Sequence, residues 1–187
     1  MDDHKLHLPN ANVHIIHRYV EDTKEDFEYL KKHLHWLRDE RIPNRPYCHM
    51  GIDYFVSTGQ VRKGYPFDAR VLEIMRTINQ TFNVRMNTCY ALFYENGNAE
   101  LPYKSNDEPQ VDLEQPAFSI GYGASRMITF KDVHNGEEYD YLLTDGDLLI
   151  MSDDCQRNYL YSVKKSTQYT EPRISLSFRK FRDGTSL

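Results

Sequence analysis

The sequence is poor in cysteine, in net positive charge and in long apolar runs, and each shortage excludes a class of protein. Three widely spaced cysteines predict neither a disulfide framework nor a zinc site, and reduced thiols fit them better. Aspartate and glutamate (28) outnumber lysine and arginine (23), which argues against binding nucleic acid over the whole surface and leaves only a local basic patch. The sequence has no apolar run near the ~20 residues that cross a bilayer and no signal-peptide pattern at its start. We therefore expect a cytoplasmic protein without membrane contact.

Helical and β patterns occupy different parts of the chain, whose 187 residues are enough for one domain with a sizeable core. Apolar residues recur at helical spacing over residues 24–40, after a capping residue at Asp22 or Thr23, and again from Asp68 to Phe82. From about residue 87, short apolar or alternating segments separated by Asn-Gly and Asp-Gly pairs predict strands at 88–95, 117–122, 126–130, 138–143, 147–151, 159–163 and 173–181. The pattern predicts one α+β domain: a strand and helix in 1–44, a hairpin and helix in 45–86, and a β core in 87–181 with both helices packed on one face.

The last predicted strand alternates strictly between apolar and polar side chains. Ile174, Leu176 and Phe178 fall on one face, whereas Arg173 and Arg179 fall on the other with two serines. If the apolar face packs against a covering layer, the arginines point into a lumen or cleft, where each needs an acidic partner or a bound anion. Two guanidinium groups six residues apart can hold the two ends of a small dicarboxylate. The alternative is a solvated strand face.

Four segments, in sequence order, resemble the AlkB-like 2-oxoglutarate- and Fe(II)-dependent dioxygenases. Residues 172–179, which read PRISLSFR, resemble the closing strand P-R-I-S/N-L-T-F-R of that family. Residues 87–97, 118–126 and 146–151 resemble its N-x-x-L-x-N-x-Y-x-x-G, S-L-G-A-x-R and G-D-L-L-V-M strands. The resemblance covers about residues 45–181 and implies a double-stranded β-helix, or jelly roll.

The resemblance places three residues at the family's iron ligands, and none of them is the family's residue. The family holds iron with an H-x-D motif and a second histidine, whereas Lys104, Asn106 and Tyr161 stand at these positions here. An ammonium has no lone pair to donate, and a carboxamide oxygen is a weak neutral ligand. Of the eight histidines only His134 lies beyond residue 49, so the later strands cannot supply two imidazoles. The sequence therefore predicts a degenerate family member that has lost its metal.

The family's co-substrate positions depart less from its pattern. Arg173 and Arg179 stand where the 2-oxoglutarate-binding arginines stand, and Tyr94 stands at an assisting tyrosine, although Leu92 replaces an asparagine. We expect either no cofactor, or 2-oxoglutarate or another small anion bound without iron. In the second case the Lys104 ammonium supplies the positive charge of the missing ion.

A rim of basic and aromatic residues precedes the second helix. Its members are Arg45, Tyr47, His49, Tyr54, Phe55, Arg62, Lys63 and Tyr65. The resemblance implies that such a rim receives flipped bases, and interleaved basic and aromatic residues suit a single strand of nucleic acid. The alternative is a hairpin whose aromatic rings face the core. The negative net charge leaves a protein partner equally open.

Three functions follow from these patterns. The first is a pseudoenzyme, in the manner of a phage or viral accessory protein, that binds a partner or a small anion. The second is an active dioxygenase that demethylates alkylated nucleic-acid bases with a non-standard metal site drawn from Asp107, Asp112 or His134. The third is metal-free chemistry with Lys104 as a base or Schiff-base amine and Tyr161 as a proton donor. We favour the first, because three ligands are replaced while their neighbours are kept.

Overall fold

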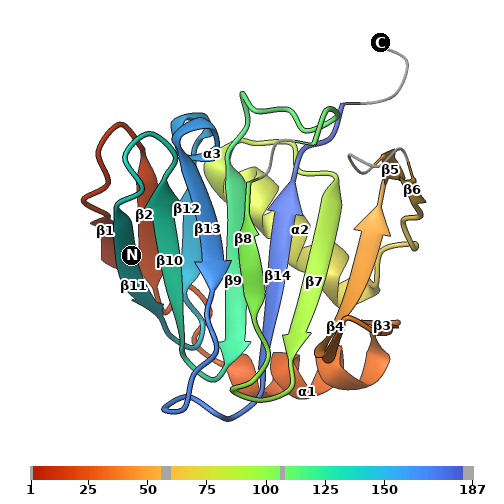
Figure 1. The fold of residues 1–187 in the computed structure, drawn as a ribbon. Coiled ribbons are helices and arrows are strands. Elements are labelled where there is room, and N and C mark those ends of the chain that lie inside the picture. Colours follow the sequence, from red (N-terminus) through yellow and green to blue (C-terminus); the bar gives the residue numbers. More distant parts are fainter. Residues whose placement is uncertain (1, 56–59, 106–107, 183–187) are drawn as a thin grey trace.

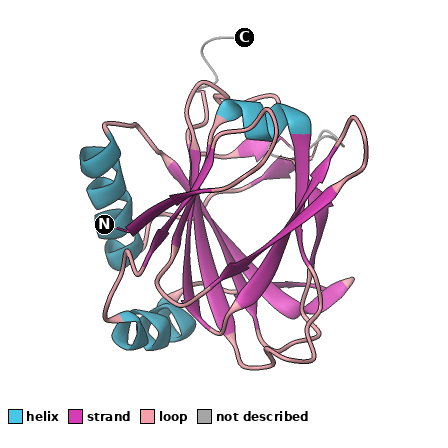
Figure 2. Cartoon of the chain, turned by 90° about the vertical axis from the view of Figure 1, so that its left-hand side faces the viewer, coloured by secondary structure: helices cyan, strands magenta, loops and turns pink. Residues whose placement is uncertain are grey.

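The computed structural model describes residues 2–55, 60–105 and 108–182, whose strands form two antiparallel sheets that face each other (Figures 1 and 2). Among these residues the larger sheet has eight strands, in the order β1 (Asp2–Lys5), β2 (Val13–His17), β12 (Leu148–Met151), β9 (Ala117–Gly123), β14 (Arg173–Arg179), β7 (Thr88–Tyr94), β4 (Ile42–Gly51) and β3 (Leu37–Asp39). The smaller sheet has four, in the order β11 (Glu138–Leu143), β10 (Arg126–Asp132), β13 (Tyr159–Val163) and β8 (Leu101–Lys104). A short hairpin of β5 (Tyr54–Phe55) and β6 (Val61–Arg62) stands apart. The predicted α+β class is confirmed.

Both faces of β14 are covered, as its alternation predicts. Ile174, Leu176 and Phe178 are fully buried in the core between the larger sheet and the helices. Arg173 and Arg179 are on the opposite face and are also buried. Burial of both faces excludes the solvated strand face as a description of the two arginines.

The helices α1 (Thr23–His33) and α2 (Ala69–Phe82) cover the outer face of the larger sheet, as Figure 2 shows. Helix α2 begins where the sequence predicts, because the Asp68 side chain accepts hydrogen bonds from the backbone N–H groups of Arg70 and Val71. It ends at Asn83, whose φ of 51° places it in the left-handed region common at helix ends. Its buried stripe, which includes Val71, packs on the sheet.

The prediction of one helix over residues 24–40 is wrong, because α1 ends at His33. Leu34 is buried in extended backbone, and the indole Nε1 of Trp36 donates to the carbonyl oxygens of Leu30 and Lys31 in the last turn. Residues 37–39 form strand β3 instead and pair with β4. Helical spacing continues past residue 33 partly because Leu34 packs on the core from extended backbone.

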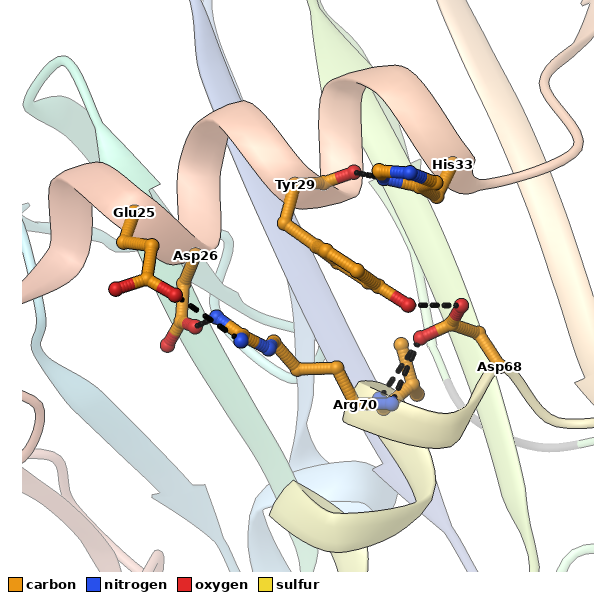
Figure 3. Close-up of polar contacts among 7 residues, drawn as sticks. Glu25, Asp26, Tyr29, His33, Asp68 and Arg70 are labelled. Atoms are coloured by element: carbon orange, nitrogen blue, oxygen red, sulfur yellow. Dashed lines mark hydrogen bonds and ion pairs between the residues drawn. The ribbon is translucent and has the colours of Figure 1, made fainter.

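A polar clamp ties α1 to the start of α2 (Figure 3). The hydroxyl of Tyr29 donates to the Asp68 carboxylate over 3.0 Å, so one carboxylate caps α2 and accepts from α1. The Arg70 guanidinium donates to Asp26 over 2.7 Å and lies 4.7 Å from the centre of the Tyr29 ring. The His33 ring also stacks on the Tyr29 ring, with 4.3 Å between the ring centres. The clamp fixes the angle between the helices that cover β14.

Several short elements were not apparent from the sequence. The N-terminal segment holds two strands, β1 and β2, where the sequence predicts one, and β8 lies within a stretch without apolar alternation. Residues 153–158 form the short helix α3 (Asp153–Asn158), shown above the sheets in Figure 1. Cys155 in this helix is buried in the core between the sheets, and burial raises the pKa of its thiol to about 12, so it is not a reactive thiolate.

Among the residues that the structure describes, no helix is both long and apolar enough to cross a membrane.

Replacing Leu176 tests the packing of the helices on β14. Leu176→Ala deletes a fully buried side chain from this core, and we expect the free energy of unfolding to fall by about 2–5 kcal/mol. Urea unfolding followed by circular dichroism measures the change. Met127→Ala, at a side chain that is 37% exposed on β10, is the control and should cost less than about 1 kcal/mol. Equal losses in the two variants would contradict this arrangement.

Candidate functional site

Lys104 and Tyr161 face each other across neighbouring strands in the space between the sheets. The register of β8 and β13 pairs Tyr161 directly with Lys104, and directly opposed residues in antiparallel strands share a face. Both side chains line an enclosed cavity of about 60 Å³. Arg179, Ser175 and Ser177 line it from β14. The structure thus brings together the lysine, the tyrosine and one of the two arginines singled out in the sequence.

A carboxylate missed by the sequence reasoning, that of Glu108, joins this group. Its Oε2 accepts a hydrogen bond from Arg179 Nη1 at 3.0 Å, and its Oε1 lies 3.9 Å from Lys104 Nζ. The side chains of Glu108 and Arg179 are only 16% and 5% exposed. The sequence carries no local signal for this role, because Arg179 lies 71 residues away along the chain.

The electrostatics of the group follow from burial and mutual proximity. Burial, and then the charge of Arg179, lower the pKa of Lys104 to about 8. Burial opposes ionisation of Glu108, yet Arg179 and Lys104 together hold its pKa below its ordinary value. Lys104 is therefore mostly protonated at neutral pH, and Glu108 is ionised between two cations.

Two further arginines add to the positive charge around Lys104. Arg45 on β4 and Arg62 on β6 both lower the pKa of Lys104, whereas Glu108 raises it. Arg45 Nη1 donates to the backbone carbonyl of Glu100 over 3.0 Å, and Arg62 Nη1 donates to the hydroxyl of Tyr90 over 2.9 Å. A chain with a net negative charge thus gathers four cations around one end of the cavity.

Arg173 lies at the other end of β14 and is not among the residues that line the cavity. Its Nη1 donates to the carbonyl of Ala124 over 2.9 Å, and burial lowers the pKa of its guanidinium to about 10. The guanidinium lies where Gly121 lacks a side chain, since a Cβ there would meet Arg173 Nη2 at 1.8 Å. Tyr94 is opposite Arg173 on β7 and does line the cavity. At roughly 3.3 Å per residue the two arginine backbones are about 20 Å apart, so one small ligand reaches both only if their side chains lean together.

The rim residues fall into two groups. Tyr47, Arg62, Lys63 and Tyr65 line an open cavity of about 350 Å³ together with His49. The Arg62 guanidinium lies 5.1 Å from the centre of the Tyr47 ring and 5.9 Å from that of Tyr54. Tyr54 is buried beneath it, in line with the core-facing alternative, whereas Phe55 is 49% exposed. Arg45 binds the Glu100 carbonyl and is not among the lining residues.

His49 has an unusual state within this cavity. Its Nε2 lies 2.8 Å from the carbonyl oxygen of Ile52, which requires a proton on Nε2, and burial lowers its pKa. The ring is then neutral, with a bare acceptor at Nδ1. Among the described residues, this buried Nδ1 has no hydrogen-bond partner.

The side chains at the three expected ligand positions do not suit an iron ion. Lys104 offers an ammonium that must lose a proton before it can bind a metal, and Tyr161 offers a phenol. Asn106 and the alternative ligand Asp107 lie outside the described residues. Within the described part of the chain, no group of three or more histidine, cysteine, aspartate or glutamate side chains is placed to hold a metal.

The other two alternative ligands are each engaged elsewhere. His134 lies in the turn between β10 and β11, with its Nε2 at 3.0 Å from the side-chain oxygen of Asn158. Asp112 lies 3.8 Å from Arg182 beyond the end of β14.

The two facing sheets and the lumen between them define a double-stranded β-helix. The solved structure of OsALKBH1 has this fold in common, with a TM-score of 0.73 over 95% of this chain and 99% of that chain, at 13% sequence identity. The predicted fold is confirmed.

The chain belongs to the 2OG-Fe(II) oxygenase superfamily, whose family model matches residues 11–179. It is AlkB-like in sequence. The "Uncharacterized protein R406" of Acanthamoeba polyphaga mimivirus is 24% identical over 146 residues, which are 76% of each chain. The "Alpha-ketoglutarate-dependent dioxygenase alkB homolog 3" of Bos taurus is 28% identical over 118 residues, or 58% of this chain. That match spans only 41% of the bovine protein, and the match to the Homo sapiens protein of the same name spans 36%.

The depressed pKa of Lys104 predicts a specific pH dependence of stability. Between about pH 8 and 10.5 the unfolded chain holds a proton that the folded chain has released, so this group adds stability as the pH rises through that window. We expect Lys104→Met to be more stable than the wild type at pH 7, with a difference that shrinks towards pH 10. Urea unfolding across this range measures it, with the surface variant Lys165→Met as the control. A difference that does not change with pH would contradict the burial of this charge.

Proposed function

We propose that this chain is an AlkB-like pseudoenzyme that binds a small anion in its lumen without iron and without hydroxylation. The observation that carries the proposal is that Lys104 and Arg179, which both line the cavity, converge on one carboxylate, that of Glu108. The carboxylate of Glu108 supports a carboxylate as the kind of group that these two cations bind. The family implies 2-oxoglutarate together with Fe(II), and only the first of these suits the side chains present.

Lys104 gives the lumen the charge that an ion would otherwise supply. An ammonium attracts carboxylate or phosphate oxygens as a point charge, and Arg179 adds planar donors. Neither Lys104 nor Arg179 can pass electrons to oxygen, so the anion binds at this site without being oxidised. The third possibility from the sequence is Schiff-base or acid–base chemistry by Lys104 and Tyr161. Attack on a ketone such as that of 2-oxoglutarate needs a neutral amine, whereas Lys104 is mostly protonated at neutral pH, so we favour binding through the charge of Lys104.

Calorimetry with 2-oxoglutarate, succinate and phosphate tests the anion site directly. In Tris buffer passed over chelating resin, we expect wild-type protein to bind at least one of them, and Lys104→Met to lower the affinity about tenfold or more. Arg173→Ala should weaken binding much less than Lys104→Met, because Arg173 does not line the cavity. Binding should also weaken as the pH rises above about 8, because Lys104 then loses its charge. Lys165→Met is the matched control. Flat titrations for all three anions would refute the proposal.

A second candidate function is an active demethylase of alkylated bases. The rim gives one observation in favour of the nucleic-acid partner that this function requires. Its basic and aromatic residues share an open cavity of about 350 Å³, which falls in the range of ligand pockets. Two of the relatives that match this chain are named as alpha-ketoglutarate-dependent dioxygenases. The same cavity also suits a protein partner that brings an acidic or aromatic side chain.

Metal content and turnover separate the two functions. After anaerobic incubation with Fe(II) and gel filtration, we expect the wild type to retain far less than one iron per chain and to release no CO₂ from 2-oxoglutarate. The triple variant Lys104→His, Asn106→Asp, Tyr161→His restores the ligand types of the family and is the positive control for iron retention. Stoichiometric iron in the wild type, with decarboxylation, would establish the active enzyme instead.

A further inference from the structure

We propose that Glu108 competes with the ligand of the lumen. Its carboxylate contacts Lys104 and Arg179 at the place where one acidic group of a small dianion binds. This inference rests on the proposed function. It makes Glu108 the residue that decides which anions enter.

The position of Glu108 is fixed by backbone contacts to the strand that carries Arg179. Its carbonyl accepts the N–H of Val111 over 2.9 Å, and the next residue, Asp112, donates its N–H to the carbonyl of Lys180 over 2.8 Å. Arg182 returns a hydrogen bond to the carbonyl of Gln110 over 2.8 Å. The carboxylate is therefore held beside Arg179 as an intramolecular ligand at high effective concentration.

Glu108 also explains how the cavity keeps two cations without a ligand. A buried guanidinium or ammonium without a counter-ion is strongly destabilising, and the Glu108 carboxylate provides one to both. An incoming anion must replace the contacts of Glu108. Its net binding free energy therefore comes only from the interactions that it makes beyond those of a single carboxylate. A monoanion such as acetate offers nothing more, whereas a dianion brings a second charged group to the surrounding arginines.

The cavity that Lys104 and Arg179 line is small. Its volume of about 60 Å³ is small beside the roughly 300–1,000 Å³ of pockets for drug-sized ligands. Glu108 comes from a loop and not from a strand, so its side chain can leave Lys104 and Arg179 without any change in the sheets. The side chain of Lys104 is itself 30% exposed.

Removing the competing charge should increase affinity and decrease stability in the same variant. We expect Glu108→Gln to bind 2-oxoglutarate about tenfold more tightly than the wild type and to unfold at lower urea concentration without ligand. The matched control is Glu100→Gln, which removes a carboxylate paired with Lys165 at the surface. If Glu108→Gln does not fold, Glu108→Asp keeps the charge, shortens the reach by one methylene, and should raise the affinity less.

The outcomes separate this inference from the proposed function. Tighter binding by the Glu108 variant with unchanged binding by Glu100→Gln supports the inference. If the wild type binds 2-oxoglutarate, Lys104→Met weakens it, and the Glu108 variants bind no more tightly, Glu108 is not a competitor and the anion site stands. If neither the wild type nor any Glu108 variant binds any anion, the anion site itself is refuted. Acetate, as the monoanion, should bind the wild type weakly or not at all, and equal affinity for acetate and 2-oxoglutarate would overturn the inference.

Discussion

The contact of Glu108 with Arg179 and Lys104 is the interaction on which the lumen depends. Arg179 is buried and Lys104 is partly buried between the sheets, and desolvation disfavours both charges. One carboxylate shared between them offsets that cost and orients both side chains towards a single point. The lowered pKa of Lys104 shows that the compensation is incomplete. An ammonium that Glu108 compensates only in part favours the binding of an anion.

Strand β14 connects this site to the rest of the fold. Its apolar face packs under α1 and α2, and its polar face carries both arginines. The clamp among Tyr29, Asp68 and Arg70 holds the two helices at the angle that covers this strand. Because a strand alternates with a period of two, the helix-facing residues set the register that turns Arg173 and Arg179 inwards.

Much of the architecture follows from local patterns in the sequence, and the exceptions have physical causes. Alternation in β14 and the cap at Asp68 are signals within a few residues, and both predict what the structure has. The end of α1 is different, because Leu34 and Leu37 repeat at helical spacing although both lie in extended backbone, and only Leu34 packs in the core. Glu108 could not be assigned from its neighbours, since its partner Arg179 is 71 residues away and the contact depends on the folded loop. Sequence motifs located the lumen, but they did not reveal its counter-ion.

The summed charge of the three ligand positions is compatible with the proposed loss of iron. In the family's arrangement a divalent ion and one carboxylate sum to +1, with two neutral imidazoles. Lys104, Asn106 and Tyr161 also sum to +1 while the lysine is protonated. Replacing the ion by an ammonium therefore leaves the electrostatic attraction for a co-substrate anion in place and removes only the redox centre. On this account Arg179 serves the part of the original chemistry that does not need a metal, which is the binding of the anion.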